Sequence, residues 1–177
     1  MTKDRRANPR SADPASLIES LQGVWRDQLA LCDALEHLAD GLPRHVDRDG
    51  CLRIARAIPP LLQKAHRLEE TTLFPLLEDR WNSLPGLPQT IEVLRFEHLE
   101  DESYADELHD ALIAHGRGMD RPSAETLGYM LRSFFENVRR HVRFDAEVLI
   151  PLLVSVQPDP GMALNRNVLS DGRYRRR

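Results

Sequence analysis

The chain has few of the residues that build disulfide-bonded or β-rich proteins. Its 177 residues include 2 cysteines, and aromatic side chains make up 6% of the total. Cys32 and Cys51 form no CxxC motif and are too few for a zinc ribbon, so we expect two buried thiols without redox activity. Runs rich in Val, Ile or Thr are scarce, whereas Leu, Ala, Glu and Arg dominate. This composition favours an all-α protein.

Long apolar segments and an excess of positive charge are also lacking. No segment approaches the ~20 consecutive apolar residues of a transmembrane helix, and the first residues contain no hydrophobic stretch typical of a signal peptide. The net charge of -4 argues against a general nucleic-acid binder. We therefore expect a cytoplasmic protein that binds neither a membrane nor nucleic acid. The arginines that flank Tyr174 are interpreted as a solvated basic tail.

Length and apolar content are sufficient for one domain with tails. At 177 residues and 41% hydrophobic side chains, the chain can bury one proper core. We expect a disordered lead-in over residues 1–14, because this segment is polar and contains two prolines. A helical domain should follow over residues 15–155, and an irregular tail over residues 156–177.

Four stretches carry apolar side chains at every third or fourth residue, the spacing of amphipathic helices. They cover residues 15–42, about 48–80, about 90–115 and 124–154. Ser123 is the expected N-cap of the last helix. Pro59 and Pro60 lie inside the second helix and should kink it or split it. Because the connections are short, the pattern predicts an antiparallel up-down-up-down four-helix bundle.

A pair of metal-ligating residue types lies on the expected buried face of the second helix. His66 and Glu70 are four residues apart, and the same face continues through Leu73 and Leu77. Burying a charged carboxylate costs several kcal/mol unless something pairs with it. A cation held between the carboxylate and imidazole groups would provide that pairing, so we expect a metal site here.

The other helices repeat parts of this pattern. His141 and Asp145 are again four residues apart, and each pair precedes a similar apolar run containing a proline, Leu-Phe-Pro at 73–75 and Leu-Ile-Pro at 149–151. His98 lies on the predicted buried stripe of the third helix, four residues before Glu102. Counting along the helices from their shared turn places His98 and His141 at the same height.

These three elements, in this order, resemble the hemerythrin-like family, whose HHE domains hold a non-haem di-iron centre in a four-helix bundle. The resemblance covers about residues 15 to 155. It implies that the terminal imidazole ligands are His66, His98 and His141, and that the bridging carboxylates are Glu70 and Asp145. Glu102 matches a position where some members have a further histidine, so its role as a ligand stays open. Imidazole and carboxylate ligands suit iron, manganese or zinc.

The first helix departs from the family pattern. The family has a ligand histidine there, but a helical projection points His37 away from the apolar stripe, towards solvent. Helix counting places Trp25 at the height of the other ligands, and an indole N–H cannot bind a metal. Gln28, one turn further, could offer a carbonyl oxygen, although we favour a surface or core amide. The number of iron ions, one or two, therefore stays open.

The remaining acidic and histidine side chains near the motifs receive no metal role. Glu69 is adjacent to the ligand face and is expected to be solvated, and Glu147 is expected to be a surface charge. His45, His109 and His115 lie near helix ends or on predicted exposed faces.

The favoured function is a non-enzymatic metal-binding protein that binds or senses O2, NO or another small diatomic ligand, responds to redox state or handles iron. One alternative is an enzyme, since relatives are linked to iron–sulfur cluster repair and others resemble oxidases or peroxidases. Such chemistry usually needs two metals or an open coordination position. Another alternative is a bundle that has lost its metal and serves as an interaction module. Assembly into a homo-oligomer is compatible with all three.

Overall fold

The computed structural model describes residues 13–155, which form four helical arms. The elements, in chain order, are α1 (Pro14–Gly41), α2 (Arg48–Leu68), the π-helical η2 (Glu69–Leu73), α3 (Phe74–Arg80), α4 (Leu87–Gly116), α5 (Ala124–Phe144), the π-helical η3 (Asp145–Leu149) and α6 (Ile150–Val154). The second arm is α2–η2–α3, and the fourth is α5–η3–α6. These residues contain no strand, so the predicted all-α class is confirmed. Apart from positions 13 and 14, the predicted lead-in and tail lie outside the described residues.

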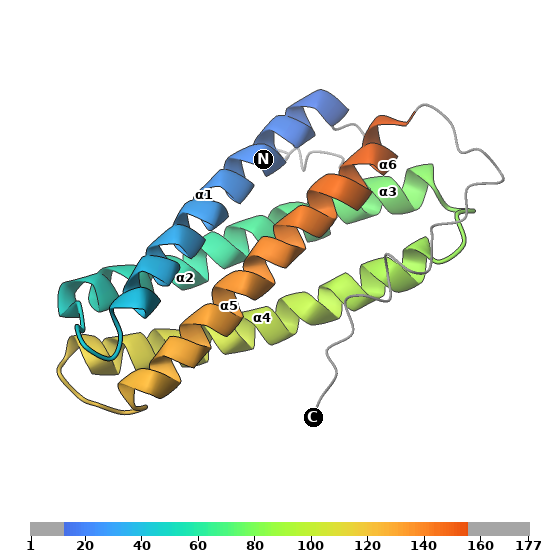
Figure 1. The fold of residues 1–177 in the computed structure, drawn as a ribbon. Coiled ribbons are helices and arrows are strands. Elements are labelled where there is room, and N and C mark those ends of the chain that lie inside the picture. The colour runs from blue at the N-terminus through green and yellow to red at the C-terminus, as the bar shows by residue number, and fades with distance from the viewer. Residues whose placement is uncertain (1–12, 156–177) are drawn as a thin grey trace, which may run out of the picture.

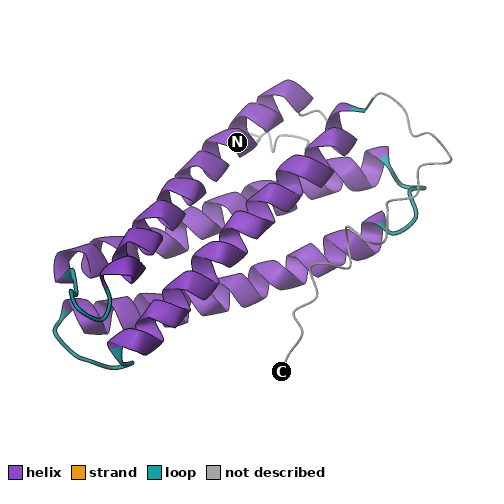
Figure 2. Cartoon of the chain, viewed as in Figure 1, coloured by secondary structure: helices purple, strands orange, loops and turns teal. Residues whose placement is uncertain are grey.

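The four arms lie side by side along one long axis (Figure 1). The first arm packs against α2 and α5, and α4 packs against the same two helices. Figure 2 shows the loops after α1 and α4 at one end of the bundle and the loop between α3 and α4 at the other. This is the loop placement that an up-down-up-down path would give. The core lies between the arms and takes apolar side chains from all of them.

Helix starts follow the expected capping chemistry. The Ser123 side chain accepts a hydrogen bond from the backbone N–H of Thr126, which confirms it as the N-cap of α5. Asp13 and Asp47 cap α1 and α2 in the same way. Gly86, with φ of 88°, precedes α4 in the left-handed conformation that glycine adopts readily. These caps fix where the long helices begin.

The two prolines inside α2 do not split it. Of the two predicted effects, a kink or a break in the helix, the break is therefore wrong. The helix runs from Arg48 to Leu68 with Pro59 and Pro60 inside it. Pro59 has no N–H to donate to the carbonyl of Ala55, four residues earlier. Instead, His109 of α4 donates from Nδ1 to the Ala55 carbonyl oxygen over 2.8 Å. A side chain from the neighbouring helix thus satisfies the carbonyl group that proline leaves without a partner.

Replacing His109 by phenylalanine should lower the free energy of unfolding by about 1–3 kcal/mol, because the Ala55 carbonyl loses this partner. Chemical denaturation followed by circular dichroism would measure the change. His45 is exposed, so the matched variant His45→Phe should change stability by less than about 0.5 kcal/mol. Equal effects from both variants would show that the Ala55 contact contributes nothing.

Both cysteines are buried, as expected. Cys32 and Cys51 are each 0% exposed. Burial raises the pKa of the Cys32 thiol to about 12 and that of the Cys51 thiol to about 11. Neither side chain is therefore a reactive thiolate at neutral pH. None of the helices in the described part of the chain is long and apolar enough to cross a membrane.

Candidate metal centre

The second and fourth arms each widen into a π-helical turn that begins at an acidic residue. In η2 the backbone N–H of Phe74 donates to the carbonyl of Glu69, and in η3 the N–H of Ile150 donates to the carbonyl of Asp145. A proline lies two residues after the end of each turn, Pro75 in one arm and Pro151 in the other. Because proline offers no N–H to the carbonyl four residues earlier, it removes one α-helical hydrogen bond in each arm, at the residues where the helix widens. The π-helical turn begins at Glu69 in the second arm and at Asp145 in the fourth arm.

This turn decides which glutamate faces the core. Glu69 is 1% exposed, whereas the side chain of Glu70 is 42% exposed. The expectation that Glu69 is solvated is therefore wrong. It assumed an α-helix with 3.6 residues per turn through this segment, and a π-helical turn contains more residues than that. The changed register brings Glu69 inward.

Three side chains from three arms meet at the centre of the bundle. One ligand atom each from Glu69, His98 and His141 lies within 4.8 Å of the other two. Oε2 of Glu69 is 3.0 Å from Nε2 of His98 and 3.3 Å from Nε2 of His141. Oδ2 of Asp145 is 3.5 Å from the same nitrogen of His141. All four residues have side chains that are at most 9% exposed.

Two further carboxylates lie on the outer side of the histidines. Glu70 Oε1 is 2.7 Å from Nδ1 of His98, and Glu102 Oε1 is 3.1 Å from Nδ1 of His66. The rings of His66 and His98 are stacked, with centroids 3.9 Å apart and planes 8° apart. Close contacts therefore connect all six predicted ligands. In this arrangement Glu70 and Glu102 hydrogen-bond histidine Nδ1 atoms, a contact that typically fixes the tautomer and orientation of a metal-binding imidazole.

Burial and the neighbouring charges perturb the titration of the cluster in different directions. Burial lowers the pKa of His66 to about 3, with the nearby His98 contributing, so this ring is neutral at pH 7. Burial alone would also lower the pKa of His141, but Asp145 and Glu69 raise it to about 10. Burial would raise the pKa of Glu69, yet the hydrogen bond from His141 and the proximity of His98 lower it to about 2. Burial raises the pKa of Asp145 well above its ordinary value.

The donor set fits a bound cation. Nε2 of His98 and both carboxylate oxygens of Asp145 are buried and have no hydrogen-bond partner among residues 13–155. His98 Nε2 lies close to Glu69 but is not aligned with it as a hydrogen bond. Buried polar atoms are normally paired, and exceptions call for an explanation. Imidazole nitrogens and carboxylate oxygens suit iron, manganese or zinc, so a bound cation would explain buried ligand atoms that have no hydrogen-bond partner in the described part of the chain.

Comparison with protein families identifies the same region. The model of the hemerythrin HHE cation binding domain matches residues 18–153. The chain belongs to the hemerythrin HHE family. This finding confirms the resemblance read from the sequence motifs, and membership of a cation-binding family implies metal binding in this bundle. No curated protein and no solved structure matches the chain.

In this hemerythrin-like bundle the first arm places a tryptophan at the level of the cluster. Asp27 of α1 pairs with Lys64 of α2 over 3.0 Å. Because the two helices are antiparallel, Trp25, two residues before Asp27, lies level with His66, two residues after Lys64. Trp25 is buried. On the α5 side, Cys32 Sγ lies 3.6 Å from the Phe135 carbonyl oxygen. The residues of α5 near position 141 therefore lie level with Gln28 and Trp25.

The other histidines lie away from the ligand set. His37 and His45 are exposed, which confirms the expectation for His37. His109 bonds to α2 as described above. His115 lies at the end of α4 but is buried at 3% exposure, and its Nε2 donates to the Pro122 carbonyl oxygen over 2.6 Å. Glu147 is exposed, as expected.

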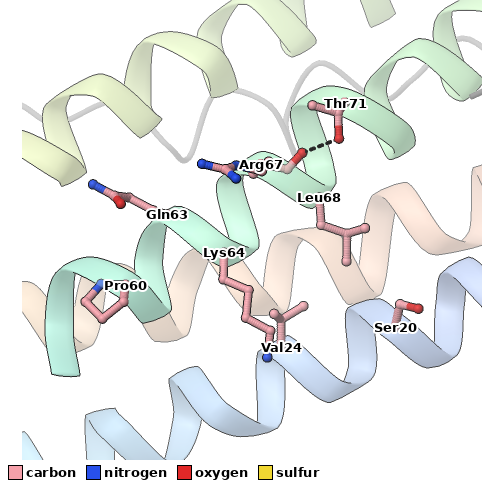
Figure 3. Close-up of a pocket in the computed structure, with 8 residues that line it drawn as sticks. All are labelled: Ser20, Val24, Pro60, Gln63, Lys64, Arg67, Leu68 and Thr71. Carbon is pink, nitrogen blue, oxygen red and sulfur yellow. Dashed lines mark hydrogen bonds between the residues drawn. The ribbon is translucent and has the colours of Figure 1, made fainter. Parts of the chain in front are cut away.

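A surface pocket of about 650 Å³ lies between α1 and α2 (Figure 3). Its eight lining residues include Lys64, Arg67 and Thr71, and they include none of the six predicted ligands. Val24 and Leu68, which also line it, directly precede Trp25 and Glu69 in the sequence. The pocket is thus separate from the cluster, although both involve the same turns of α1 and α2.

Proposed function

We propose that this hemerythrin-family protein holds non-haem iron between its second arm, α4 and its fourth arm, and uses it to bind or sense a small ligand such as O2 or NO. The observation that supports the proposal is the buried group of Glu69, His98 and His141, whose ligand atoms lie within 4.8 Å of one another. Asp145 lies beside His141, and both of its buried carboxylate oxygens have no hydrogen-bond partner among residues 13–155. Bound iron would supply a redox couple and a coordination position for the small ligand.

The chain's own residues would have distinct roles in this proposal. Glu69, His98, His141 and Asp145 would hold the metal, and His66 would complete the set on the α2 side. Glu70 and Glu102 would orient His98 and His66 through their Nδ1 atoms. The buried apolar side chains around the cluster would exclude bulk water and keep these electrostatic interactions strong.

Metal counting tests the proposal. Protein purified from iron-supplemented cells should contain about one metal ion per chain and lose it to a chelator. Reloading with free metal at about 1,000 times its dissociation constant should raise the free energy of unfolding by about 4 kcal/mol, because metal binds the folded state alone. Exposing the reduced, iron-loaded protein to NO should change its absorbance spectrum.

The opposite result would favour a different function. Less than about half an equivalent of any transition metal, with no change in stability on chelation, would contradict metal binding. The bundle would then be better described as an interaction module. If the spectrum of the metal-loaded protein did not respond to O2 or NO, the proposed metal binding would stand and the proposed ligand sensing would be contradicted.

A further inference from the structure

The inward face of α1 carries two buried polar atoms that have no hydrogen-bond partner among residues 13–155. They are Nε1 of Trp25 and Oε1 of Gln28. Trp25 is 7% exposed and Gln28 is 3% exposed. The other tryptophan shows the usual arrangement, since Nε1 of buried Trp81 donates to the Leu152 carbonyl oxygen over 2.9 Å. A buried donor or acceptor without a hydrogen bond costs free energy. These two atoms lie one helical turn apart, and a bound ligand would supply the missing partner of each.

The pair lies at the level of the metal cluster. The Asp27–Lys64 ion pair joins α1 to α2, and residue counting from it puts Trp25 at the height of His66. The contact between Cys32 and Phe135 joins α1 to α5, and residue counting from it puts Gln28 about level with position 139, two residues from His141. The first arm thus carries one donor and one acceptor without hydrogen-bond partners among the described residues, at the height at which the other three arms carry the candidate metal ligands.

The two atoms are complementary to one class of small molecule. An indole N–H can only donate, and an amide oxygen can only accept. A single small ligand that pairs with both must accept one hydrogen bond and donate one. Water and hydrogen peroxide carry an O–H group and meet this requirement, whereas O2, NO and azide can only accept.

We propose that Trp25 and Gln28 form a binding site on α1 for a small O–H ligand of the metal centre, with the Trp25 N–H donating a hydrogen bond to the ligand oxygen and Gln28 Oε1 accepting one from the ligand O–H group. This inference rests on the proposed metal-binding function. It makes the two residues ligand-positioning groups. Both would bind a ligand with an O–H group, whereas O2 and NO would be held by the Trp25 N–H alone.

Nuclear magnetic resonance of the two tryptophan indole N–H groups tests the inference on the full chain loaded with zinc, which has no redox chemistry. Zinc content is counted first. Titration with hydrogen peroxide should move the Trp25 signal until it saturates, and azide should move it as well. Trp81 is already paired, so its signal should stay in place and provides an internal control.

The variant Gln28→Met separates the two probes. It should weaken hydrogen peroxide binding about tenfold, the loss expected for one hydrogen bond, and leave azide binding unchanged. A zinc-loaded protein whose Trp25 signal moves with neither probe would overturn the inference while leaving the proposed metal site intact. Unchanged peroxide affinity in Gln28→Met would also overturn it, as would loss of zinc from that variant, since Gln28 would then be a metal ligand. Failure of the wild-type chain to bind zinc, iron or manganese would contradict the proposed function itself.

Discussion

Replacing Glu69 by glutamine is expected to abolish metal binding at micromolar metal concentrations, while the same change at Glu70 leaves a weakened site. Glu69 is 1% exposed and its carboxylate lies within 3.3 Å of Nε2 atoms of both His98 and His141. An amide keeps the size of this side chain but removes its charge and one acceptor oxygen. Titration of the metal-free protein, followed by calorimetry, would measure the affinity of each variant.

Glu70 provides the matched control because it is the adjacent residue with the same side chain. Its carboxylate contacts Nδ1 of His98, the nitrogen on the outer side of the ring. Loss of a group that orients a metal-binding histidine typically lowers metal affinity by about 10- to 100-fold. Circular dichroism should show that both variants remain helical. If Glu70→Gln lost the metal and Glu69→Gln kept it, the assignment of the inward-facing glutamate would be wrong.

Replacing Trp25 by histidine is expected to raise the metal content from about one ion per chain towards two, since a second imidazole would join His66 on the α2 side. Trp25 is buried and lies level with His66, as the Asp27–Lys64 ion pair indicates. Indole has no lone pair for a metal, so the wild-type chain offers no ligand from this position. Elemental analysis of iron-loaded, desalted protein would give the stoichiometry.

The variant Trp25→Phe controls for the loss of the indole ring itself. It removes the same bulk but supplies no nitrogen ligand, so its metal content should match that of the wild-type chain. An unchanged stoichiometry in Trp25→His, from protein shown to be folded, would mean that α1 does not lie in the register inferred here. A rise in both variants would show that the extra space, rather than the imidazole, admits the second ion.

The periodic pattern of apolar residues was sufficient to predict the helices and the level of the histidines. His66, His98 and His141 each lie on an apolar stripe, and their rings lie within 6.2 Å of one another between centroids. Counting residues at a constant rise per residue also placed Trp25 level with His66, because α1 and α2 are long and uninterrupted there. Regular helices make such counting reliable.

The choice between Glu69 and Glu70 could not come from helical periodicity, because the chain leaves the α-helical repeat at that point. The sequence nevertheless contained a signal. Glu69 lies six residues before Pro75, and Asp145 lies six residues before Pro151. Aligning the two arms on their prolines would have paired Glu69 with Asp145, whereas aligning them on their histidines paired Glu70 with Asp145.

The partnership between His109 and Ala55 had no comparable signal. It depends on which residue of α4 lies beside the prolines of α2, a contact between residues 54 positions apart. Similarly, the missing partners of Trp25 and Gln28 become visible only when all neighbouring side chains are placed. Such features arise from tertiary packing, and a single sequence gives little information about them.

Anomalous X-ray diffraction from crystals of the iron-loaded protein, collected at the iron absorption edge, would test the central claim most directly. The account predicts an anomalous peak among Glu69, His98 and His141, with Asp145 beside it and Glu70 on the outer side of the His98 ring. A peak ligated by Glu70 with Glu69 turned away, a peak elsewhere in the bundle, or no peak from protein shown to be exposed to iron would contradict it.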